Sequence, residues 1–80
     1  MGSEVNNLKD FQKWVKIQLL MNDKTQRALA DEMDIAYPRV SEALHGKRTG
    51  YRYIRPIIEK LGGNLDDFEV FLNEMDKKIK

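Results

Sequence analysis

Residues 25–30 read TQRALA and residues 40–48 read VSEALHGKR, and these two short segments decide how the chain is interpreted. Each segment has the apolar spacing of a short helix, and the gap between them leaves room for a tight turn. The second segment runs into a basic loop. Two short helices, a turn and a basic loop form the layout of a helix-turn-helix unit.

The bulk properties describe a single small domain. The chain has 80 residues, enough for one hydrophobic core, and it contains no cysteine. The absence of cysteine fits a reducing compartment, and we expect a cytoplasmic protein. No apolar run approaches the length of a membrane span or of a signal-peptide core. We expect residues 1–7 to be an N-terminal tail in which residues 1–3 remain from cloning, and residues 8–80 to be one domain.

Basic residues are distributed unevenly although the net charge is only +1. Residues 24–60 carry eight Lys or Arg side chains against five acidic ones, whereas residues 61–80 carry three against five. The basic excess therefore lies on the two decisive segments and on the loop that follows them. A local basic face favours contact with phosphates more than the total charge does.

The hydrophobic periodicity predicts an all-α chain, because no segment alternates with the period of a half-buried strand. We expect a compact five-helix bundle. Its first helix would run over about 8–21 with Asn6 or Asn7 as the N-cap, and its fourth over about 54–61. The fifth would follow over 65–80, with an apolar stripe between 65 and 79. That stripe either covers the bundle or forms part of a dimer seam.

The central helix pair carries clear start and stop signals. Thr25 is a good N-cap, and Ala30 is small where a crossing helix must come close. Asp34 falls where a helix commonly ends in a left-handed residue, Pro38 fits the first turn of the next helix, and Gly46 ends that helix. The side chains expected to point to the core are Leu29, Met33, Val40 and Leu44.

These residues resemble the lambda-type repressor, Cro and Xre family of helix-turn-helix regulators from phages and mobile elements. The shared pattern is Thr-Gln-x-x-Leu-Ala, a small turn, and then Val-Ser-x-x-Leu-x-Gly-Lys-Arg. This chain carries the two halves of the pattern at 25–30 and 40–48, and the likeness covers roughly residues 8–72. The resemblance implies a lambda repressor-like bundle that lays its third helix, near residues 37–45, in the DNA major groove.

The function that the resemblance implies is sequence-specific regulation of transcription by a repressor or Cro-like switch protein. The implied partner is double-stranded DNA with an inverted-repeat operator, bound by a homodimer. No cofactor and no membrane are implied. Gln26 would contact a phosphate, and Arg52 occupies a loop position from which relatives reach the minor groove. The residues predicted to bind DNA are Gln26, Tyr37, Pro38, Arg39, Ser41, Glu42, Lys47, Arg48 and Arg52.

Several of these side chains also have an ordinary structural explanation. Tyr37 either lies on its own helix in solvent or presses on a thymine methyl group or a sugar. Arg39 either pairs with Glu42 or Asp34 at the surface, or reaches a phosphate or a guanine. Glu42 repels phosphate, but it can also accept a hydrogen bond from cytosine N4. Lys47, Arg48 and Arg52 either decorate a solvated loop or contact phosphates.

Catalysis and metal binding have no support in the residue pattern, so we expect neither an enzyme nor a metal site. The chain has one histidine, His45, and it lacks both a phosphate-cradling glycine loop and metal-ligand spacing. The alternative function is an antitoxin or adaptor module whose main partner is a protein. A missing basic surface near Arg39 and Arg52, together with an exposed apolar groove on 65–79, would favour that alternative.

Overall fold

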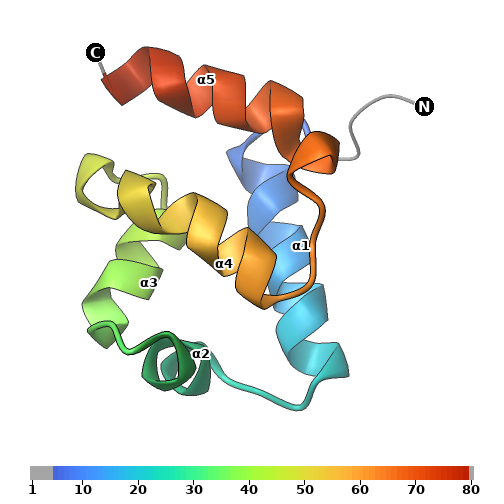
Figure 1. The fold of residues 1–80 in the computed structure, drawn as a ribbon, viewed down its shortest axis with the longest axis vertical. Coiled ribbons are helices and arrows are strands. Elements are labelled where there is room, and N and C mark those ends of the chain that lie inside the picture. The colour runs from blue at the N-terminus through green and yellow to red at the C-terminus, as the bar shows by residue number, and fades with distance from the viewer. Residues whose placement is uncertain (1–4, 80) are drawn as a thin grey trace.

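Figure 1 shows the computed structural model of the chain, which describes residues 5–79. Over this range every regular element is a helix, which confirms the predicted all-α fold with five α-helices. Two short 3₁₀ helices, η1 and η2, lie between them. The elements are α1 (Leu8–Met21), α2 (Gln26–Met33), α3 (Tyr37–Leu44), η1 (Arg48–Tyr53), α4 (Ile54–Lys60), η2 (Leu65–Phe68) and α5 (Glu69–Ile79). The residues expected to remain from cloning, 1–3, lie outside the described range.

The first helix has the bounds that the sequence predicts. The Asn7 side chain caps α1 by accepting a hydrogen bond of 2.9 Å from the backbone N–H of Asp10. The side chains of Phe11, Val15 and Leu19 recur every four residues, and all three are buried. One face of α1 is therefore committed to the core, and the opposite face stays in solvent.

The next two helices follow their predicted caps closely. The Thr25 hydroxyl accepts from the backbone N–H of Ala28 and so caps α2. Asp34 ends α2 in the predicted left-handed conformation, with a φ of 57°. Only three residues separate α2 from α3, and Ala36 begins α3 without a side-chain cap. Pro38 stands in the first turn of α3, where its missing N–H has no helical partner to lose.

An aromatic cluster joins α1 to the C-terminal part of the chain. The rings of Phe11 and Phe71 stack with their centroids 4.8 Å apart, and Trp14 meets the Phe68 ring edge-on at 4.8 Å. Such ring pairs stabilise a core beyond the area that they bury. Phe71 is fully buried although it falls between Phe68 and Leu72, two positions of the predicted apolar stripe. Val5, expected in the tail, is also buried, and its backbone N–H donates to the Asp67 carbonyl oxygen.

The predicted basic loop at 47–53 is wrong in its conformation, because Arg48–Tyr53 forms the 3₁₀ helix η1. The backbone N–H of Gly50 donates to the Lys47 carbonyl oxygen at 2.9 Å, which is the three-residue spacing of a 3₁₀ turn. Gly50 itself is buried against α3. The tight turn follows from that close approach, since a glycine lets the two backbones meet.

The predicted start of the fifth helix is also wrong. Asn64 is the N-cap of η2, and its side chain accepts from the backbone N–H of Asp66, only two residues ahead. That short local bond favours a turn over an α-helix, so η2 comes first and α5 begins at Glu69. The stripe side chains Phe68, Leu72 and Met75 are buried within the chain. They therefore cover the bundle, as one of the two predicted alternatives requires.

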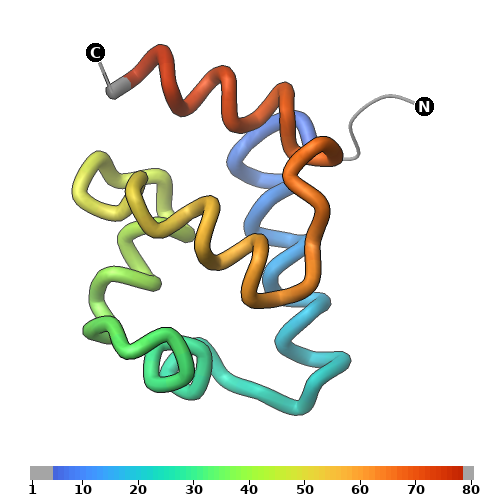
Figure 2. Tube along the Cα trace, in the orientation of Figure 1, coloured from blue at the N-terminus to red at the C-terminus, as the bar shows by residue number. Residues whose placement is uncertain are grey.

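The five helices are arranged so that α3 and α1 lie on opposite sides of the view in Figure 1. The helix α5 crosses the top and α2 the bottom, with α4 between them. The tube in Figure 2 shows how the chain turns sharply at η1, beside the C-terminal end of α3, before it enters α4. None of the helices described for residues 5–79 has the length and apolar character needed to cross a membrane.

Candidate nucleic-acid interface

The outer face of α3 gathers most of the residues that the sequence predicts to bind DNA. Tyr37, Pro38 and Arg39 form its first turn, and all three are exposed. Ser41 and Glu42 follow on the same helix and are half-buried. The opposite face, with Val40, Ala43 and Leu44, is buried in the core. An eight-residue helix is thus held by one face and presents the other.

Arg39 and Glu42 form an ion pair, and a residue from η1 joins it. Arg39 Nη1 donates to Glu42 Oε1 at 2.9 Å, and the Thr49 hydroxyl donates to the same oxygen at 2.9 Å. An exposed pair one helical turn apart contributes little to stability. Its effect here is geometric, because it holds the Arg39 guanidinium along the helix face and ties that face to η1.

The ionisation of Glu42 strengthens this arrangement. The Arg39 guanidinium, and after it the Thr49 hydroxyl, lower the pKa of Glu42 below its ordinary value of 4.5. The carboxylate is therefore charged at neutral pH and remains an acceptor. Glu42 Oε2 has no hydrogen-bond partner among residues 5–79, so it is available to a ligand. The pair offers several N–H donors on Arg39 and one open acceptor on Glu42.

Tyr37 is positioned by a cation that the sequence did not single out. The guanidinium carbon of Arg27, on α2, lies 4.8 Å from the centroid of the Tyr37 ring. At this distance the cation is attracted to the face of the ring. The contact orients the exposed ring and also brings a further positive charge from α2 beside the first turn of α3.

The cations of the predicted basic loop now lie on the ordered helix η1 and the residue before it. Lys47, Arg48 and Arg52 are all exposed. The backbone N–H of Lys47 donates to the Glu42 carbonyl oxygen at 2.9 Å, which fixes the path out of α3. A Cβ atom on Gly50 would collide with backbone atoms of Ala43 and Glu42. The charged segment is therefore fixed against α3 rather than free to move.

Gln26 lies at the start of α2 and is half-buried. It lines a cleft of about 370 Å³ that also contains Lys16 from α1 and His45 from the end of α3. The Nδ1–H of His45 donates to the carbonyl oxygen of Ser41 at 2.7 Å, so the His45 side chain caps the C-terminal end of α3. The backbone N–H groups of the first turn of α2 add positive potential at this point.

Two residues at this surface escaped the sequence prediction: Arg27 and Thr49. Arg27 follows the predicted phosphate contact Gln26, so its position in the first turn of α2 was a usable signal. The sequence around Thr49 contains no such signal, because the contact of Thr49 with Glu42 depends on the turn at Gly50.

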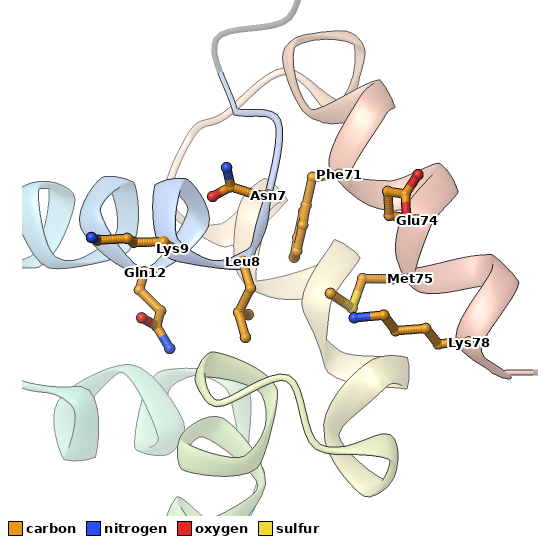
Figure 3. A pocket seen from close by; sticks show the side chains of 8 residues that line it. All are labelled: Asn7, Leu8, Lys9, Gln12, Phe71, Glu74, Met75 and Lys78. Carbon is orange, nitrogen blue, oxygen red and sulfur yellow. The ribbon is translucent and has the colours of Figure 1, made fainter.

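A second cleft, of about 610 Å³, lies between α1 and α5 (Figure 3). Its α5 wall carries Phe71 and Met75, which Figure 3 shows pointing toward α1, and its α1 wall carries Leu8. The polar side chains at its rim are Asn7, Lys9, Gln12, Glu74 and Lys78. It is open to solvent and mixed in character, and it lies apart from the outer face of α3.

Comparison with known protein families, with curated proteins and with solved structures found no match to this chain. The function must therefore be inferred from the geometry of the molecule. Among residues 5–79, no three His, Cys, Asp or Glu side chains converge to form a metal-binding group.

Proposed function

We propose that this protein binds double-stranded DNA in a sequence-specific manner and regulates transcription, with α2 and α3 acting as a helix-turn-helix unit. In this proposal α3 enters the major groove, and the bound protein represses by occupying promoter DNA. Two copies would bind an inverted repeat, because a symmetric operator matches a symmetric pair of reading helices. The observation that carries the proposal is the exposed outer face of α3, with the Arg27 guanidinium beside its first turn and the exposed cations Lys47, Arg48 and Arg52 beyond its C-terminal end.

The phosphate contacts would come from both sides of α3. Lys47, Arg48 and Arg52 would contact the strand on one side of the groove, and Gln26 would contact the strand on the other side. These contacts anchor the protein but carry no sequence information. Neutralisation of phosphates by Lys47, Arg48 and Arg52 releases counterions, so affinity should fall steeply with salt.

The base contacts would come from the Arg39–Glu42 pair. Arginine donors match O6 and N7 of guanine, and a carboxylate oxygen can accept from N4 of cytosine. One side-chain pair that offers donors beside an open acceptor therefore suits a G·C base pair. Tyr37, held by Arg27, would lie beside this position and contact a thymine methyl group or a sugar.

The test is selection of bound sites from a pool of random duplex DNA, followed by a salt titration on the enriched sequence. We expect an inverted repeat with a preferred G·C pair at one position of each half-site. Replacement of Arg48 by alanine should weaken binding to all duplexes about equally. It should also reduce the slope of log affinity against log salt by about one unit for each phosphate that the variant no longer neutralises.

The control is Lys77→Ala, which removes an exposed cation on α5 that is not among the residues proposed to bind DNA. It should leave both the affinity and the salt slope unchanged. If no sequence is enriched, and the two variants behave alike on random duplexes, the DNA-binding proposal is wrong.

The second candidate function is that of an adaptor or antitoxin that binds a protein. The cleft between α1 and α5 in Figure 3 is the observation in its favour. Against it, Arg39 and Arg52 are both exposed, so the basic surface whose absence would favour this alternative is present. A negative result in the DNA selection would make this cleft the next region to test.

A further inference from the structure

The outer face of α1 carries apolar side chains that stay largely exposed within the described residues 5–79. Ile17, Leu20 and Met21 are 52%, 80% and 74% exposed. They occupy the last turn and a half of α1, on the side opposite the buried Phe11 and Val15. Side chains three and four residues apart lie next to one another on a helix, so the three form one continuous patch. Scattered exposed apolar residues are ordinary, but a contiguous patch marks an interaction surface.

The charges around this patch are unpaired and are divided between its two ends. Lys13 and Lys16 precede it on the same helix, and Asp23 follows it in the turn after α1. All three are exposed, and none makes an ion pair with the residues that the structure describes. By contrast, the neighbouring Lys24 is paired with Glu32 at 2.8 Å. The free charges flank the apolar patch with opposite signs.

The pattern of apolar and charged side chains on α1 is complementary to the same pattern on a second copy related by a twofold axis. In a twofold contact, residue i of one copy meets residue j of the other, and j then meets i. If two α1 helices cross antiparallel near Leu20, the apolar patches of both copies meet. The two lysines of each copy then approach Asp23 of the other. A parallel crossing through this face would instead place like charges together at both ends.

We propose that the outer face of α1, from Lys13 to Asp23, is a surface through which two copies of this chain associate antiparallel. The apolar contact supplies the attraction, and the lysine–aspartate contacts set the register. The association does not rest on DNA binding, because the C-terminal end of α1 lies across the molecule from α3 in Figure 1. Both copies of α3 stay exposed in the pair.

The contact should be weak. A stable interface buries about 800 Å² on each partner and involves roughly 20–30 residues a side. The α1 face offers three apolar side chains and three charged ones, well below that size. We expect a dissociation constant on the order of 0.1 mM, which only concentrated protein or two copies on one DNA molecule would populate.

Sedimentation equilibrium without DNA, at about 10 μM to 1 mM protein, tests the apolar part. The unmodified chain should show a monomer–dimer equilibrium, and Leu20→Ser should weaken it about tenfold or more. Leu20 is largely exposed, so this substitution does not disturb the core. The matched control is Val70→Ser, because Val70 is an exposed apolar residue on α5, outside the patch. It should leave the equilibrium unchanged.

A charge exchange tests the register. The double variant Lys13→Glu/Lys16→Glu should associate less than the unmodified chain, and so should Asp23→Lys, because each places like charges together. An equimolar mixture of the two variants should associate more strongly than either variant alone, since opposite charges then face each other across the mixed pair.

A chain that remains monomeric at the highest concentration would overturn the proposal, and the patch would then belong to a different partner. Association that Leu20→Ser leaves intact, or that the mixture fails to improve, would also overturn it. Either result leaves the DNA selection untouched, so the two proposals fail separately.

Discussion

The two ends of α3 differ in how they are held. At the C-terminal end, Gln12 Nε2 donates to the Leu44 carbonyl oxygen at 2.6 Å, and Gly50 lies against the backbone of Ala43. At the N-terminal end, Ala36 provides no side-chain cap, and the first turn is exposed. The last turn of α3 is therefore held by contacts with other parts of the chain, whereas its first turn is exposed to solvent.

Because of this difference, the C-terminal end of the eight-residue helix α3 should contribute mainly to stability, and its N-terminal end mainly to recognition. A substitution at the anchored end disturbs packed backbone and apolar side chains, so it should act on the free energy of unfolding. A substitution at the exposed end removes groups that contact solvent, one another, or the surface side chains Arg27 and Thr49. It should act on what the protein binds, with little effect on folding. Substitutions at the two ends can test that division, beginning with the one of largest expected effect.

Gly50→Ala should be the most damaging change at the anchored end. The added Cβ would collide with the backbone of Ala43 and Glu42, which cannot yield as a side chain can. We expect the free energy of unfolding to fall by about 3 kcal/mol or more, or the chain to fail to fold. The measurement is unfolding in urea. Gly62→Ala is the control: its Cβ would meet nothing within 4 Å, but its φ of 83° should cost about 1 kcal/mol. Equal destabilisation of the two variants would mean that η1 is not locked onto α3.

Ala30→Leu should have the next largest effect. Ala30 is 1% exposed on α2, and Val40 of α3 is fully buried, so the larger side chain would overpack the region where these helices meet. We expect destabilisation by roughly 1–3 kcal/mol in the same urea experiment. Ala28→Leu, at a half-buried position of α2, should cost less. A fully stable Ala30→Leu variant would show that the two helices do not pack through this residue.

The exposed end should respond in specificity instead. Arg39→Ala should reduce the preference for one G·C pair by about 1–3 kcal/mol and leave the urea midpoint almost unchanged. Glu42→Gln retains an acceptor for Arg39 but removes the charge, so it should lower the preference by less. Competition binding with duplexes altered at single positions measures both. An unchanged ranking of sites in both variants would show that this pair does not read the base.

Local caps and turns could be predicted from the sequence, whereas the contacts of the exposed surface could not, and the reason is physical. Asn7, Thr25, Asp34 and Gly46 act through bonds or backbone angles within a few residues of themselves, and each lies where its local signal indicates. The Thr49–Glu42 bond depends on a turn that forms only when Gly50 packs on α3.

The same contrast holds elsewhere in the chain. The predicted start of α5 was wrong because the hydrogen bond from the Asp66 N–H to the Asn64 side chain competes with the helical pattern that follows. The exposed patch at Leu20 was not predicted, since it departs from the polar surface expected opposite a buried stripe. Periodicity reports which face a helix buries, but not what covers the other face.

The smallest expected effect concerns the connection that leads to the free end of α3. Asp34 has a φ of 57°, a conformation that a non-glycine residue adopts at a cost of about 1 kcal/mol, and less for Asp. Its side chain is exposed and makes no hydrogen bond with the described residues, while its backbone N–H donates to the Asp31 carbonyl oxygen. Asp34→Gly should therefore be neutral or stabilise by up to ~1 kcal/mol, because relief of strain is offset by the greater freedom of glycine in the unfolded chain. Asp34→Ala keeps a non-glycine residue at this positive φ, so it should be less stable than Asp34→Gly in the same urea experiment. If α3 is oriented from its C-terminal end, Asp34→Gly should also leave the ranked list of DNA sites unchanged. A clear drop in stability, or a new ranking of sites, would instead show that the connection at Asp34 helps to position the first turn of α3.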